Sequence, residues 1–197
     1  MGGSATGSSV STQPGASPLP VRARTRPRTA GREETQPLRG WRIAVPEHAR
    51  TVEEMLSGKG ALLHGARWNS PGRRAVYLGS SLALASMELL VRLKHPEVLQ
   101  AYRKLRVGIP PDLVKAVDRK QLPADWARTS LHPATQRIGD RWLDSLESAV
   151  LAVPSAVVVG EVNYIVNPAH PDFARLEPGE ITDYRHDPRI LKASGGR

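Results

Sequence analysis

Three short runs of mostly apolar residues follow one another between residues 150 and 166, and they constrain the fold more than any other feature. The runs are Val150–Val153, Ser155–Val159 and Val162–Val166, separated by Pro154 and Gly160. Valine and isoleucine favour an extended backbone, and short apolar runs between turn residues are typical of strands with two buried faces. We therefore predict that these runs form central strands of a sheet.

The rest of the chain predicts strands and helices in mixed order. Strands are expected at Trp41–Val45, Ala61–Arg67, Ala75–Leu78 and about Lys104–Ile109, with the second and third forming a hairpin around the turn Asn69–Gly72. Helices are expected at Val52–Leu56, at Asp112–Asp118, at Thr135–Ser148, and from a cap at Ser80 or Ser81 to about Lys94. Because strands and helices do not alternate strictly, the order favours an α+β fold over a doubly wound parallel sheet.

Each of the two long helices carries one apolar face, which we expect to be buried. On the first helix this face consists of Leu82, Ala85, Leu89 and Leu93, with Met87 and Leu90 widening it. On the second helix it consists of Ile138, Trp142 and Leu146.

Residues 1–40 differ in composition from the rest of the chain. They contain no aromatic residue and are rich in Ser, Thr, Pro and Gly, so they cannot bury enough apolar surface to offset the entropy of ordering. We predict a disordered basic tail, since six Arg and two Glu contribute +4 of the net charge of +9. This charge attracts polyanions, so a basic nucleic-acid-binding regulator stays open as an alternative, although no aromatic residues interleave to stack on bases.

Several classes of protein are excluded by what the sequence lacks. Cysteine is absent, which rules out disulfides and thiolate-bound metals, and no plausible metal cluster is visible. No run of eighteen apolar residues predicts a transmembrane helix, and the first residues lack the apolar stretch of a signal peptide. We expect a cytoplasmic protein without a membrane partner. Gly58-Lys59-Gly60 is not a phosphate-binding loop, because the upstream Gly of that motif is missing.

The chemistry is concentrated in residues 65–88, where an Arg, a Tyr and a Glu follow one another. Arg67 stands before the turn of Asn, Ser, Pro and Gly, Tyr77 lies in the next predicted strand, and Glu88 borders the apolar face of the following helix. A guanidinium binds phosphate through two parallel hydrogen bonds and stays charged at any relevant pH. With an aromatic ring and a carboxylate beside it, it suits a ligand that carries phosphates, a flat base and a sugar. Each residue alone also fits a structural role, as a surface ion pair or a core aromatic.

These residues, taken with others along the chain, resemble the RES domain, the toxin half of bacterial RES–Xre toxin–antitoxin pairs. The family is named for a recurring Arg, Glu and Ser, which Arg67, Glu88 and Ser155 match, and Tyr77 matches the tyrosine between the first two. Further matches are Trp41-Arg42, the run Gly139–Leu143 and the run Asn163–Pro171. The resemblance covers about residues 41–191, and we assign residues 41–197 to a RES domain and residues 1–40 to the tail. One departure is Ala66, where the family usually has a second glycine before the Arg.

The resemblance implies a fold similar to ADP-ribosyltransferases, with a split, mostly antiparallel sheet and flanking helices. It implies an enzyme that consumes NAD by cleaving the nicotinamide–ribose bond, through hydrolysis, phosphorolysis or transfer of ADP-ribose to a protein, without a metal. The implied catalytic residues are Arg67, Tyr77, Glu88 and Ser155, and the implied NAD contacts are Arg42, Arg67, Tyr77 and Asn163. The implied partner is an Xre-family antitoxin that covers the active-site cleft, so that any contact with nucleic acid is indirect. A homo-oligomer within that complex and a catalytically inactive interaction module both stay open.

Overall fold

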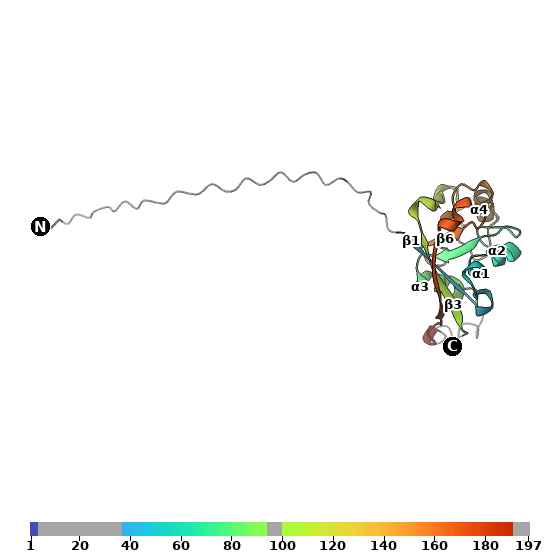
Figure 1. Cartoon of the computed structure of the whole chain (residues 1–197). Coiled ribbons are helices and arrows are strands. Elements are labelled where there is room, and N and C mark those ends of the chain that lie inside the picture. The colour runs from blue at the N-terminus through green and yellow to red at the C-terminus, as the bar shows by residue number, and fades with distance from the viewer. Residues whose placement is uncertain (4–36, 94–99, 191–197) are drawn as a thin grey trace, which may run out of the picture. The chain divides into compact units, whose positions relative to one another are not determined.

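The computed structural model describes residues 1–3, 37–93 and 100–190 (Figure 1). The predicted tail falls largely outside the described residues, as does the predicted helix end at Lys94. The chain divides into two units, Met1–Glu34 and Thr35–Arg197, and the second contains all of the helices and strands described below. The strands are β1 (Leu38–Ala44), β2 (Val76–Gly79), β3 (Tyr102–Ile109), β4 (Val114–Ala116), β5 (Val150–Pro154), β6 (Val162–Val166) and β7 (Glu177–Tyr184). The α-helices are α1 (Val52–Met55), α2 (Lys59–His64), α3 (Leu82–Leu90) and α4 (Pro133–Ser145). Short 3₁₀ turns lie at Pro46–His48, Pro111–Leu113, Arg119–Gln121 and Pro171–Arg175.

The seven strands form one sheet in the order β4-β5-β6-β2-β1-β3-β7. Every neighbouring pair is antiparallel except β4 and β5. Seven positions pair β1 with β3, whereas β1 and β2 share the single pair Trp41 and Gly79, so the sheet splits between them. These observations confirm the predicted α+β class with a split, mostly antiparallel sheet.

The central strands separate two apolar clusters. Val76, Leu78, Val150 and Val166 belong to one cluster, and Ile165 belongs to the other with Leu151 and Val153. Successive residues of β5 and β6 therefore point into different clusters, which requires apolar residues at nearly every position. This arrangement explains the continuous apolar runs and confirms Val150–Val153 and Val162–Val166 as strands.

The helix α4 covers the second cluster with part of the face predicted for it. Trp142 and Leu143 are buried and Ile138 is half-buried, whereas Leu146 is 44% exposed. Leu146 takes the left-handed backbone conformation, with φ of 51°, and ends the helix one turn before the predicted boundary at Ser148. On α3, the predicted cap Ser81 accepts a hydrogen bond from the amide of Leu84. Met87, which we expected on the buried face, is instead 44% exposed.

The predicted strand Ala61–Arg67 is wrong, and so is its hairpin with Ala75–Leu78. Lys59–His64 forms α2, which begins after Gly58 at φ of 66° and ends at Gly65 at φ of 64°. Alanine and leucine are strong helix formers, and the two left-handed glycines bound a single short helix between them. The strand β2 pairs with β6 and β1 instead.

Three further predictions along the chain are also corrected. Residues Ser155–Val159 form a turn instead of a strand, because the Ser155 hydroxyl accepts hydrogen bonds from the amides of Val157 and Val158. The predicted helix Asp112–Asp118 is a 3₁₀ turn followed by β4, whose residues pair with Val150–Ala152. The edge strand β7 was not predicted, since its sequence, Glu-Pro-Gly-Glu-Ile-Thr-Asp-Tyr, lacks an apolar alternation.

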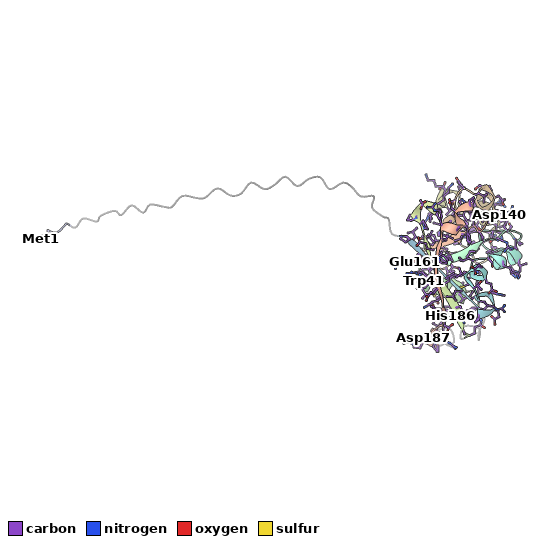
Figure 2. All side chains as sticks on the ribbon, viewed as in Figure 1. Met1, Trp41, Asp140, Glu161, His186 and Asp187 are labelled. Carbon is purple, nitrogen blue, oxygen red and sulfur yellow. The ribbon has the colours of Figure 1, made fainter. Side chains whose placement is uncertain are left out.

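At one end of the folded unit, side chains join the segment after β7 to α3. Figure 2 shows Asp140 of α4 and His186 near opposite ends of this unit. His186 follows β7, is 4% exposed, and its Nδ1 lies 3.1 Å from the hydroxyl of Ser86 on α3. None of the helices within the described ranges has the length and apolarity needed to cross a bilayer.

Candidate active site

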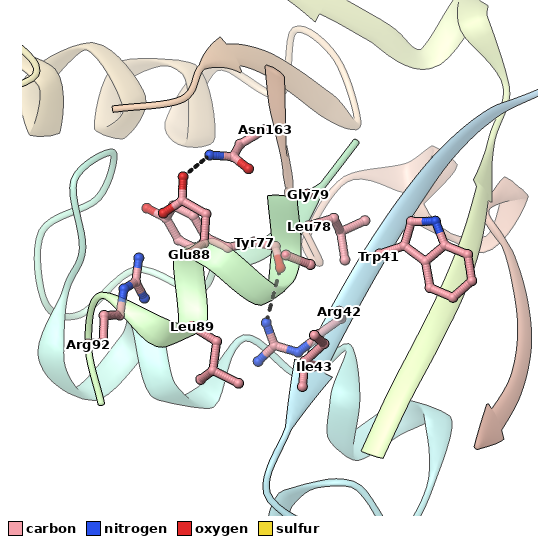
Figure 3. A pocket seen from close by; sticks show the side chains of 11 residues that line it. Trp41, Arg42, Ile43, Tyr77, Leu78, Gly79, Glu88, Leu89, Arg92 and Asn163 are labelled. Carbon is pink, nitrogen blue, oxygen red and sulfur yellow. Dashed lines mark hydrogen bonds between the residues drawn. The ribbon is translucent and has the colours of Figure 1, made fainter. Parts of the chain in front are cut away.

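A cleft opens where the sheet splits, and it consists of two adjoining cavities. The smaller, of about 110 Å³, lies between β1, β2 and α3 (Figure 3). The larger, of about 580 Å³, lies between α3, the turn at residues 65–68, the loop at residues 127–131 and the turn after β5. Both are lined by Tyr77, Glu88, Arg92 and Asn163. The larger volume falls within the range of small-molecule sites, about 300–1,000 Å³.

Glu88 is held at the centre of this cleft by two polar side chains. Its Oε1 accepts a hydrogen bond of 2.8 Å from the hydroxyl of Ser155 and one of 2.6 Å from Nδ2 of Asn163. Among the described residues, nothing donates a hydrogen bond to its Oε2. Two donors on one oxygen fix the carboxylate plane and leave the other oxygen to face the cavity.

Ser155 owes its position to the turn that replaced the predicted strand. Its backbone amide donates to the carbonyl of Glu161, and its hydroxyl accepts from the two amides that follow in the turn. The side chain is 4% exposed. Because the hydroxyl has a single proton, which it donates to Glu88, its geometry is that of a group that orients the carboxylate. No Gly-x-Ser-x-Gly turn surrounds Ser155, so the sequence does not indicate a hydrolase nucleophile at this position.

Arg67 lines the larger cavity and also holds the loop across from it. Its Nη1 donates to the carbonyl oxygen of Trp126 over 2.8 Å, and its Nη2 donates to that of Arg128 over 2.9 Å. Burial lowers the pKa of Arg67, while the nearby Glu88 carboxylate opposes that shift. Two of its five N–H donors are thus used by the loop, and three remain for a ligand.

Tyr77 is fixed by hydrogen bonds at its hydroxyl. The hydroxyl donates to Oδ1 of Asn69 over 2.8 Å and accepts from the amide of Trp68 over 3.2 Å. Burial raises the pKa of Tyr77, so the phenol stays protonated. Asn69 is fully buried, and its Nδ2 lies within hydrogen-bonding distance of the carbonyls of Ala61, Ser70 and Arg73. The sequence predicted Asn69 only as a turn residue. Its role in fixing Tyr77 was indicated only by the tendency of asparagine side chains to hydrogen-bond nearby backbone groups.

The helix α4 holds the turn that carries Arg67. Asp140 accepts hydrogen bonds from both the amide and the hydroxyl of Ser70, at 2.9 and 2.7 Å. Gln136 donates to the carbonyl of Ala66 over 3.1 Å. The run Gly139–Leu143, which carried part of the resemblance, therefore lies outside the cleft and supports it. Ala66, the departure from the family pattern, is not among the residues with a positive φ, so its methyl group causes no backbone strain.

Arg42 spans the split in the sheet. Its Nη1 donates to the carbonyl of Tyr77 over 3.3 Å, in place of the missing strand pairing (Figure 3). Within the described part of the chain its buried Nε has no hydrogen-bond partner. Burial, and secondarily the charge of Arg92, lower the pKa of Arg42 to about 10, so the guanidinium is still charged at neutral pH.

The cleft as a whole is cationic. Of the residues that the structure describes, three guanidinium groups line it, from Arg42, Arg67 and Arg92, against one carboxylate, that of Glu88. The predicted site residues Arg42, Arg67, Tyr77, Glu88, Ser155 and Asn163 all meet around this cleft. Arg92 was not predicted as a site residue. Its position four residues after Glu88, on the same helical face, was the feature of the sequence that could have indicated it. No group of metal-binding side chains occurs among the residues that the structure describes.

Comparison with known proteins identifies relatives over most of the folded unit. Residues 39–187 match the RES domain. The chain is 37% identical over 146 residues to "Toxin Res" of Photorhabdus laumondii, covering 74% of this chain and 94% of the relative. It is 33% identical over 156 residues to the "Prs ADP-ribosylating toxin" of Sphingobium, covering 77% and 96%. The MbcT–MbcA toxin–antitoxin complex of M. tuberculosis contains a similar fold, with a TM-score of 0.58 at 19% identity, covering 80% of this chain and 88% of that one.

Proposed function

Because the chain belongs to the RES-domain family, we propose that it is a toxin that binds NAD in the cleft and cleaves the bond between nicotinamide and ribose. The observation that carries this proposal is the position of Glu88. One of its oxygens is fixed by Ser155 and Asn163 and the other faces a cavity of about 580 Å³ lined by cationic groups. NAD supplies what such a cleft recognises, namely a diphosphate, two riboses and a cationic leaving group.

The chemistry needs charge stabilisation more than covalent help. Cleavage of a glycosidic bond passes through an oxocarbenium-like state, in which positive charge develops on the ribose. A carboxylate held in place beforehand stabilises that charge without reorganising during the reaction. We assign this role to Glu88, with its Oε2 directed to the ribose. Ser155 and Asn163 keep the carboxylate in place.

The aromatic and cationic groups bind the rest of the substrate in this proposal. Tyr77, whose hydroxyl is already occupied by Asn69 and Trp68, presents its ring as a wall for the nicotinamide or its ribose. Arg67 contacts phosphate with the donors that the loop leaves free. Arg42 adds positive charge from inside the split. Each of these contacts binds substrate, so their loss should raise KM more than it lowers kcat.

The acceptor of ADP-ribose is water, phosphate or a protein side chain. The relative from Sphingobium is named for ADP-ribosylation of Prs, which supports transfer to a protein as one of the three. The proposal includes a protein antitoxin of the Xre family that covers the cleft. The toxin–antitoxin complex of similar fold supports such a partner.

Purified protein incubated with NAD, with and without inorganic phosphate, tests the proposal directly. Mass analysis separates free ADP-ribose, a phosphorylated ADP-ribose and an adduct on added bacterial protein. Loss of NAD with release of nicotinamide is expected in at least one mixture, and Glu88→Gln is the matched inactive control. An intact NAD pool in all mixtures, together with salt-dependent binding to DNA or RNA, would favour the basic nucleic-acid-binding regulator instead.

A cellular experiment extends the test. Expression of the chain alone should arrest bacterial growth by draining NAD, and Glu88→Gln should relieve the arrest. Co-expression of the cognate antitoxin should restore both growth and the NAD pool. Rescue of growth without measurable binding between the two proteins would contradict inhibition by covering the cleft.

A further inference from the structure

Arg92 lies where the two cavities of the cleft meet. It lines both of them, as Figure 3 shows for the smaller, and its side chain is exposed. It follows Glu88 by four residues, just past the end of α3, and its amide donates to the carbonyl of Leu89. Four residues advance a helix by about 6 Å. The guanidinium therefore reaches the cleft about one helical turn away from the carboxylate.

The other two cations of the cleft are already engaged. Arg67 donates to two carbonyls of the loop, and Arg42 lies inside the split and donates to the carbonyl of Tyr77. Within the ranges that the structure describes, Arg92 forms neither an ion pair nor a side-chain hydrogen bond. All five of its N–H donors are thus available, in a planar fork that matches two oxygens of a phosphate.

The local electrostatics call for a cation at this position if a phosphate is to bind there. The carbonyl end of a helix carries partial negative charge, and α3 ends immediately before Arg92. The carboxylate of Glu88 adds a full negative charge one turn earlier. A diphosphate at this end of α3 would be repelled by both unless a positive group stood between them, and the Arg92 guanidinium is in that place.

We propose that Arg92 binds the diphosphate of NAD at the junction of the two cavities, and so fixes the ribose against Glu88. The inference rests on the proposed function and deepens it. With Glu88 on the ribose, the adjoining diphosphate lies one helical turn along α3, within reach of Arg92. Arg42 adds charge and Arg67 adds the phosphate contact that its remaining donors allow, while Arg92, with all of its donors available, makes the bidentate contact.

Kinetics of Arg92→Ala and Arg92→Lys provide the test, with Arg137→Ala as the matched control. Arg137 is an exposed helical arginine on α4 and lines neither cavity. Loss of a charged hydrogen bond predicts that Arg92→Ala raises KM for NAD about tenfold to a hundredfold and leaves kcat within about threefold. Arg92→Lys should recover part of the loss, because it keeps the charge and loses the fork. Arg137→Ala should behave as the wild type.

Calorimetric titration with ADP-ribose separates this inference from the proposed function, because binding of that ligand needs no cleavage. Arg92→Ala should raise the dissociation constant for ADP-ribose by the same factor as it raises the KM for NAD. If the wild type leaves NAD intact but binds ADP-ribose through Arg92, the proposed reaction fails and the inference stands. An unchanged dissociation constant for ADP-ribose in folded Arg92→Ala protein overturns the inference, and so does a loss of kcat with KM unchanged.

Discussion

The hydroxyl of Ser155 donates a 2.8 Å hydrogen bond to Oε1 of Glu88, joining a turn after β5 to the last turn of α3 across 67 residues of sequence. Asn163 reaches the same oxygen from β6. Three separate elements thus define the position of one carboxylate. Such a site depends on the fold as a whole, because no local segment could hold all three groups.

Glu88→Gln tests the charge of that carboxylate with little change in shape. The amide oxygen can still accept from Ser155 and Asn163, so the fold should be intact and the melting temperature close to that of the wild type. Loss of one well-placed electrostatic contact to the transition state costs about 2.7–4 kcal/mol, a hundredfold or more in kcat. Nicotinamide release measures the effect. Near-normal turnover by a folded variant would rule out the proposed role.

Arg67→Lys should be severe, although it keeps the positive charge. A lysine cannot donate to the carbonyls of Trp126 and Arg128 in the geometry of a guanidinium and still face the cavity. We expect a higher KM for NAD together with faster hydrogen exchange in residues 126–128. Steady-state kinetics and exchange followed by mass spectrometry measure the two effects. If neither the KM nor the exchange rate changes, the two-pronged hydrogen bonding of the Arg67 guanidinium contributes nothing to binding or to the loop.

The central strands of the sheet could be predicted because strands buried on both faces need apolar residues at nearly every position, which gives a continuous apolar run. The run Ala61–Leu63 was wrongly predicted as part of a strand, since a few apolar residues do not distinguish a period of two from one of 3.6. The glycines at the two ends of α2 bound a helix there instead. The exposed edge strand β7 left no apolar signal. Residues Ser155–Val159 were predicted as a strand from their propensity alone. They form a turn because the Ser155 hydroxyl accepts hydrogen bonds from the amides of Val157 and Val158.

The residues of the cleft were predicted from the resemblance more than from their own patterns. The short stretch from Arg67 to Glu88 indicated the kind of ligand, but only the fold brings Ser155 and Asn163 to the same carboxylate. Arg92 was missed because a lone arginine after an amphipathic helix is ordinary on a protein surface. Its meaning depends on the cavity in front of it.

Two truncations test where the folded unit begins. Leu38, Arg39 and Gly40 pair with Ile109, Gly108 and Val107, although the strand was predicted to start at Trp41. Removal of residues 1–36 should leave stability and NAD turnover unchanged, because that segment lacks core-forming residues. Removal of residues 1–40 should cost about 1–3 kcal/mol, since it breaks ladder hydrogen bonds worth about 0.5–1.5 kcal/mol each. Urea unfolding compares the two. Loss of NAD turnover after removal of residues 1–36 would contradict the prediction that these residues form a tail outside the folded unit.

Gly139→Ala tests whether α4 sets the turn that carries Arg67. A Cβ at this position would lie 1.8 Å from the carbonyl oxygen of Trp68, so either the helix or the turn must move. Overpacking of this kind costs about 1–3 kcal/mol, and the displaced turn should also raise KM for NAD. Gly60→Ala is the matched control, because a Cβ there meets nothing within 4 Å and alanine favours the helix by up to about 1 kcal/mol. Urea unfolding and steady-state kinetics give both readouts. Wild-type stability and KM in Gly139→Ala would mean that the backbones can separate without disturbing Arg67, and that α4 does not set the geometry of the cleft.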